Sequence, residues 1–168
     1  MASFEQYTDT NTGATLWVTY YHGIRYLGKD ETYPVIGAPA WCYNCNCLVV
    51  AESFMTNSEF QLRLKQLDEL IEGKKSELSM LFESIEKAHA QKREMLNFRE
   101  FIRLRKRGPS CLECNDTNIY VLPKNRNEAI AIPGGPSLRY DSWGFADCGI
   151  EPCYLLDCSG HRIREQHD

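Results

Sequence analysis

The chain lacks several features that would place it in a common functional class. No stretch approaches the roughly 20 uninterrupted apolar residues of a membrane-spanning helix. Residues 1–6 contain neither a basic nor an apolar segment, so we expect no secretory signal. There is no His-Glu-x-x-His, no Gly-x-Ser-x-Gly and no phosphate-binding glycine loop, and the histidines are scattered. These absences predict a cytoplasmic protein that is not an enzyme.

The bulk composition is ordinary for a folded protein. The 168 residues are 43% hydrophobic and 25% charged, which suits one domain, or a small domain with a helical insertion. The net charge of −4 argues against a general nucleic-acid coat.

Cysteine, by contrast, is abundant. Eight cysteines without an export signal indicate a reducing compartment, in which thiols bind metal or stay free. An even number also allows a disulfide framework, which is the alternative interpretation.

Two cysteine pairs, distant in sequence, have metal-binding spacing. Cys42 and Cys45 are separated by two residues, and so are Cys111 and Cys114. Two thiolates at this spacing can bind one ion while the backbone turns around it, and two such pairs supply the four ligands of a closed structural zinc site. We therefore predict these four cysteines as Zn²⁺ ligands, although iron can take the same ligand set.

An asparagine follows each pair, namely Asn46 and Asn115. The residue after such a turn often needs a left-handed backbone, which Gly adopts freely and Asn tolerates better than most residues. The repeated Asn supports two equivalent turns.

These turns, each followed by a strand-like segment, resemble the knuckles of zinc-ribbon and rubredoxin-like proteins. The resemblance covers about 20 residues, in 42–50 and 111–122. It implies a structural metal and a role in protein interaction or nucleic-acid binding. Zinc ribbons usually carry Gly where Asn46 and Asn115 stand, and their insertions are seldom so long.

The segments around the cysteine pairs are strand-like. Residues 16–21, 48–52 and 118–122 are rich in β-branched and aromatic residues. We expect 24–27 to return as a hairpin beside 16–21, and the polar residues 1–12 to be loose at their very end. The predicted fold class is α+β, a small antiparallel zinc-ribbon-like β scaffold formed by 1–57 and 108–168.

Residues 58–107 predict an inserted antiparallel helical hairpin with a coiled-coil-like apolar stripe. From 59 to 107 there is no proline and one glycine, Gly73. One unbroken helix would be about 75 Å long and would separate the cysteine pairs. We therefore place a break near Gly73, with a second bend conceivable at 88–91 and Ser58 as N-cap. The alternative is a long helix that dimerises and completes each metal site between chains.

The remaining cysteines are ambiguous. Cys47 is an alternative ligand, but we expect it to be a thiol buried in a strand. Cys148, Cys153, Cys158 and His161 form a candidate second metal site whose spacing fits no common pattern.

Five cations gather near the end of the helical segment: Arg99, Arg103, Arg105, Lys106 and Arg107. They predict either a solvated helix end or, alternatively, a nucleic-acid contact. We favour a protein-interaction module of a bacterial accessory, immunity or adaptor type. It would act as a monomer or as a homodimer through the helical segment.

Overall fold

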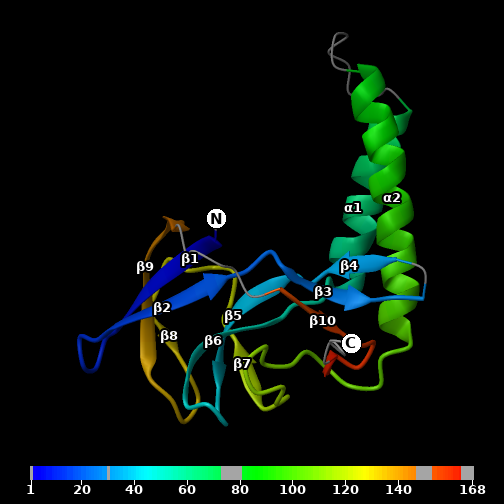
Figure 1. Cartoon of the computed structure of the whole chain (residues 1–168). Coiled ribbons are helices and arrows are strands. Elements are labelled where there is room, and N and C mark those ends of the chain that lie inside the picture. The colour runs from blue at the N-terminus through cyan, green and yellow to red at the C-terminus, as the bar shows by residue number, and fades with distance from the viewer. Residues whose placement is uncertain (1, 30, 73–80, 147–152, 164–168) are drawn as a thin grey trace. The chain divides into compact units, whose positions relative to one another are not determined.

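The computed structural model describes residues 2–29, 31–72, 81–146 and 153–163 (Figure 1). The chain divides into two compact units, which we call the β unit (Met1–Ser53 with Lys106–Asp168) and the helical unit (Phe54–Arg105). The predicted α+β class with antiparallel sheets and two helices is confirmed. No helix within the described residues combines the length and apolar character that a membrane crossing requires.

The first sheet of the β unit contains the N-terminal strand. Its order is β2-β1-β9-β8, and all neighbours are antiparallel. Its strands are β1 (Ala2–Asp9), β2 (Thr15–Tyr20), β8 (Ile130–Ala131) and β9 (Ser137–Ala146). Strand β1 begins at Ala2, so the expectation of a loose end is wrong from this residue on. Residues Ala2 and Tyr7 are fully buried, and this sparse apolar pattern is hard to recognise in a polar segment.

The second sheet carries the first cysteine turn, which connects β5 to β6. It has the order β6-β5-β7, and consists of β5 (Gly37–Cys42), β6 (Cys47–Glu52) and β7 (Ile119–Val121). One face contributes Trp41 and Leu48 to the main core, which also contains Tyr7, Val18 and Leu138 from the first sheet. The opposite face forms a second, smaller apolar cluster. Its buried members are Ala40, Cys42, Val49 and Ala51 from the strands, together with Cys111. Both faces are covered, so these strands are apolar at nearly every position.

The third sheet corrects one predicted pairing. Its order is β11-β10-β3-β4, with bounds β3 (Ile24–Leu27), β4 (Thr32–Pro34), β10 (Tyr154–Leu156) and β11 (Arg162–Ile163). Strand β3 pairs with β4 and, in parallel, with β10, and so does not return beside β2. This partner lies about 130 residues further along the chain, and local patterns carry no information about such a pairing.

The helical unit consists of α1 (Asn57–Ile71) and α2 (Leu81–Arg103), drawn side by side in Figure 1. Arg99 contacts the start of α1, at Asn57, while Lys92 contacts Asp68 near its end, so the helices are antiparallel. The predicted break near Gly73 lies outside the described residues. The conceivable bend at 88–91 is absent, since α2 is continuous there.

The cap of α1 also differs from the prediction. Thr56, two residues before Ser58, is the N-cap, and its side chain accepts a hydrogen bond from the backbone N–H of Glu59. The Glu59 carboxylate accepts in return from the Thr56 N–H, which completes a capping box. Both positions fit the motif, Thr56 with Glu59 and Ser58 with Gln61, so the sequence pattern alone does not distinguish them.

Candidate metal centre

The first cysteine turn, residues 42–46, connects β5 to β6. Cys42 is the last residue of β5 and lies opposite Cys47, the first residue of β6. The backbone N–H of Cys45 donates to Cys42 Sγ over 3.4 Å, so the chain wraps around the first sulfur. Asn46 has φ 52°, which confirms the predicted left-handed residue.

The second cysteine turn, residues 111–115, has the same construction. The Glu113 N–H donates to Cys111 Sγ over 3.4 Å, and the Asn115 N–H donates to the Cys111 carbonyl over 2.9 Å. Asn115 has φ 64°, which confirms the second left-handed position. The two turns are thus built alike, although about 70 residues separate them.

The fold brings the two turns together through β6. The N–H of Leu112 donates to the carbonyl of Val50, and Ala51 forms an isolated antiparallel bridge with Cys111. The second turn therefore adds to the strand that leaves the first turn. This backbone pairing helps to set the separation of the two cysteine pairs.

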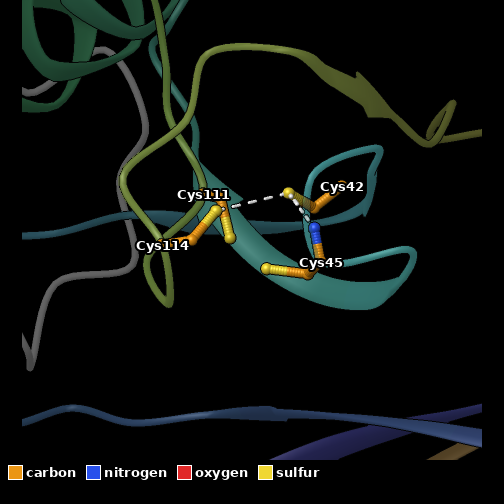
Figure 2. A group of neighbouring side chains, drawn as sticks. All are labelled: Cys42, Cys45, Cys111 and Cys114. Atoms are coloured by element: carbon orange, nitrogen blue, oxygen red, sulfur yellow. Dashed lines mark hydrogen bonds between the residues drawn. The ribbon is translucent and has the colours of Figure 1, made fainter.

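The four sulfurs form one compact cluster (Figure 2). The Sγ atoms of Cys42, Cys45, Cys111 and Cys114 all lie within 4.8 Å of one another. Cys42 Sγ and Cys114 Sγ are 3.5 Å apart, well beyond the S–S bond of about 2.05 Å. Cys42 and Cys111 are buried, and Cys45 and Cys114 are half-buried. Four thiols arranged in this way can bind one metal ion.

The electrostatics of the cluster depend on burial. Burial raises the pKa of Cys45, and it raises the pKa of Cys111 to about 11, although backbone hydrogen bonds from Cys114 and Glu113 oppose it. Burial also acts on Cys114, but hydrogen bonds from the Asn44 side chain and the Asp116 backbone outweigh it, and the pKa falls to about 7. A cation at the centre would stabilise all four thiolates against this burial penalty.

A buried polar network supports the second turn, and sequence analysis missed it. Glu52, at the end of β6, is fully buried. Its Oε1 accepts from the Tyr26 hydroxyl at 2.7 Å, and its Oε2 accepts from the Ser110 N–H at 2.9 Å and the Ser110 hydroxyl at 2.7 Å. Arg107 donates to the Ser110 hydroxyl oxygen and to the Asn115 side-chain oxygen. No local pattern marks Glu52, because a carboxylate at a strand end is usually solvated.

The remaining thiols have different positions. Cys47 is exposed, so the expectation of a buried thiol is wrong: β6 is an edge strand and Cys47 is its first residue. Cys148 lies outside the described residues. Cys153 is exposed and Cys158 half-buried, and no group of three ligand residues containing them occurs in the described part of the chain. His161 instead lies 3.5 Å from Asp157. The second metal site stays a prediction.

The predicted cations make contacts within their own units. In the helical unit, Arg99 lies over the Phe60 ring at 4.1 Å, and Arg105 lies over the Phe54 ring at 4.9 Å. Arg103 pairs with Glu100 on the same helix. In the β unit, Arg107 supports the second turn. Lys106 also belongs to the β unit. These contacts give four of the five cations a structural role. Nucleic-acid binding by this cluster stays a prediction.

A pocket of about 460 Å³ lies beside the second cysteine turn. Leu112 and Glu113 line it together with His22, Tyr154 and Arg162. None of the four clustered cysteines lines this pocket. A solute held there would therefore meet the outer side of the turn rather than the sulfur atoms.

Comparison of the chain with protein-family models, curated proteins and solved structures gave no match.

Proposed function

We propose that the four-cysteine cluster binds one structural Zn²⁺. Thiolates about 2.3 Å from a tetrahedral zinc lie about 3.8 Å from one another. The 3.5 Å separation of two sulfurs, and the limit of 4.8 Å for all pairs, are close to that geometry. Four thiolates complete the zinc coordination, so no position remains open for a substrate or an activated water. This closed ligand set is the observation that supports a structural, non-catalytic role.

Native mass spectrometry tests the metal directly. We expect one zinc per chain in the wild type and a loss of zinc in Cys42→Ser and Cys111→Ser, which remove one ligand from each turn. Cys47→Ser is the matched control, since this thiol is exposed and lies outside the cluster, and it should keep the zinc. A chain that folds without metal, or that carries iron instead, would contradict the proposal.

On this scaffold we propose that the helical unit serves as a protein-interaction arm of an adaptor or accessory protein. Two antiparallel helices can cover only one face of each other, so apolar residues elsewhere on them meet solvent. Leu62 on α1 is 58% exposed, and Leu96 on α2 is 43% exposed. The contacts of Asp68 with Lys92 and of Phe60 with Arg99 place these leucines at about the same level along the pair. Each helix thus offers an exposed leucine at this level for apolar contact with a protein partner.

Site-specific photo-crosslinking in the cells that make the protein tests this arm. A photoreactive residue at Leu62 or Leu96 should give the same crosslinked partner, and the neighbouring exposed Gln61 should give far less of it. The double variant Leu62→Glu/Leu96→Glu should lose the partner in co-purification and keep its zinc. Equal crosslinking from Gln61, or an unchanged yield from the double variant, would contradict an interaction arm at these leucines.

A further inference from the structure

Strand β9 has an edge that is largely free in the β unit. One edge pairs with β1 from Leu138 to Ala146. The opposite edge pairs with β8 only at Ser137 and Leu138. Within the described residues, no strand pairs with this edge beyond Leu138. Free strand edges present unsatisfied N–H and C=O groups, and these can pair with a further strand.

A β-bulge limits the usable part of this edge. Gln6 of β1 lies opposite Ser142 and Tyr7 lies opposite Tyr140, so Asp141 is the additional residue in β9. A bulge bends its strand and interrupts regular pairing. The regular stretch available to a new strand is therefore 142–146.

This stretch also carries exposed aromatic residues. Trp143 and Phe145 are each 62% exposed, and their rings contact one another at 5.3 Å between centroids. Trp143 lies opposite Glu5 of β1, Tyr140 lies opposite Tyr7, and Leu138 lies opposite Asp9. Alternate residues of β1 share one face, so Trp143 lies on the same face as Tyr140 and the fully buried Leu138. The apolar face that forms the main core thus continues along β9 into an uncovered aromatic pair.

We propose that a second copy of this chain pairs antiparallel with β9, with a two-fold axis at Gly144. The stretch has an aromatic residue on each side of this glycine. Pairing about the axis places Trp143 of one copy directly opposite Phe145 of the second copy, and the reverse pair forms by symmetry. Aromatic pairs directly across an antiparallel ladder stabilise it, and an interface that uses the same patch twice closes as a dimer.

The opposite face of the sheet is already filled at the axis. A Cβ added to Gly144 would lie 2.8 Å from Cζ of Phe4, so the Phe4 ring covers this glycine. Phe4 also packs against Trp17 with ring centroids 5.1 Å apart. The strand at the axis is therefore held from one side, and only its aromatic face and its backbone edge remain to be covered.

Charge is absent from the stretch itself and present at both of its ends. Residues 142–146 are uncharged, and Asp141 and Asp147 flank them in the sequence. Asp141 pairs with Arg139 at 3.3 Å within the chain. Pairing about Gly144 brings Asp141 of one copy into register with Asp147 of the second copy, and like charges opposite one another weaken a ladder, so the charges favour a weak dimer.

The surface that the four aromatic rings would bury indicates how tightly two copies bind. An aromatic side chain presents about 150–250 Å², so four rings that are 62% exposed come to about 500 Å². Stable interfaces bury about 1,200–2,000 Å² in total. We therefore expect a weak dimer that dissociates on dilution.

Sedimentation equilibrium over about 10 μM to about 1 mM, on the zinc-loaded full chain, tests this proposal. We expect a monomer–dimer equilibrium that Trp143→Lys and Phe145→Lys each weaken by at least about tenfold, as removal of a central aromatic contact does. Val121→Lys is the control, because Val121 is 41% exposed on β7 of a different sheet, and it should leave the dimer unchanged. Circular dichroism and zinc content identify any variant that fails to fold.

Hydrogen exchange of the wild type provides a test that needs no variant. Amides of 142–146 that point away from β1 should become protected as the concentration rises. A chain that stays monomeric throughout, a dimer insensitive to Trp143→Lys, or a dimer lost in Leu62→Glu/Leu96→Glu would overturn the proposal. The proposed dimer is independent of the proposed interaction arm. A result that excludes the dimer would leave zinc content and crosslinking at Leu62 unchanged.

Discussion

The Glu52 carboxylate accepts hydrogen bonds from both donors of Ser110, the backbone N–H at 2.9 Å and the hydroxyl at 2.7 Å. Both residues are buried, with exposed fractions of 0% and 1%. Ser110 immediately precedes Cys111, so this contact attaches the second cysteine turn to the end of β6. Together with the backbone pairing of Leu112 and Val50, it determines where the second pair of sulfurs lies relative to the first.

Removing the hydroxyl of Ser110 should loosen this attachment. Ser110→Ala leaves the buried carboxylate with one donor fewer, and we expect the free energy of unfolding to fall by about 1–3 kcal/mol. Denaturant titration of the zinc-loaded protein measures this change, and Ser159→Ala, at a half-buried serine of the same unit, serves as the control. If Ser110→Ala matched the control, the hydrogen bond would have no net value for stability.

The two asparagines with positive φ should respond differently to glycine. Asn46→Ala should cost about 1–2 kcal/mol, because an alanine Cβ is strained in the left-handed region. Asn46→Gly should change stability by less than about 1 kcal/mol, because glycine adopts this conformation freely. Asn115→Gly should destabilise more than Asn46→Gly, since the Asn115 side chain accepts a hydrogen bond from Arg107. Thermal unfolding of the three variants compares them, and equal behaviour of both glycine variants would show that the Arg107 contact contributes nothing.

The capping box of α1 predicts a difference between two neighbouring hydroxyl residues. Thr56→Ala removes the side-chain oxygen that accepts from the Glu59 N–H, and should lower the stability of the helical unit by about 0.5–2 kcal/mol. Ser58→Ala should have a much smaller effect, since Ser58 does not occupy the cap. Helical circular dichroism during urea unfolding separates the two variants, and a larger loss from Ser58→Ala would be evidence against Thr56 as the N-cap.

Asp141 predicts a component of acid sensitivity. A hydrogen bond from the Thr8 hydroxyl, with a further contribution from Arg139, holds the pKa of Asp141 below its ordinary value of 3.8. A carboxyl group with a lowered folded-state pKa stabilises the protein above the unfolded-state pKa, and this stabilisation is lost as the pH falls through the folded-state pKa. Asp141→Asn should therefore flatten the loss of stability below about pH 4. Unfolding free energies measured across this range test it, with the exposed Glu128→Gln as control, and an unchanged acid limb would contradict it.

Several parts of the fold follow from short-range patterns. The Cys-x-x-Cys-Asn pattern predicted two turns with left-handed asparagines, and Asn46 and Asn115 confirm it. The β-branched run at 48–52 predicted β6, and the apolar stripe after residue 58 predicted helix. Each of these patterns involves residues that lie close together in the sequence. Strand β1 was missed because only Ala2 and Tyr7 along it are fully buried, which gives too little alternation to recognise.

The sequence by itself determined which atoms are available for a metal ion, where the cysteine turns form and which segments are helical, because these depend on residues a few positions apart. Only the tertiary structure decided that Leu112 pairs with Val50, that Glu52 is buried against Ser110, and that β9 has a partly free edge bearing Trp143. These features depend on contacts between residues about 60 or more positions apart, or on which strand covers which edge. The free energy of such contacts appears only once the chain is folded, and local propensity does not encode it.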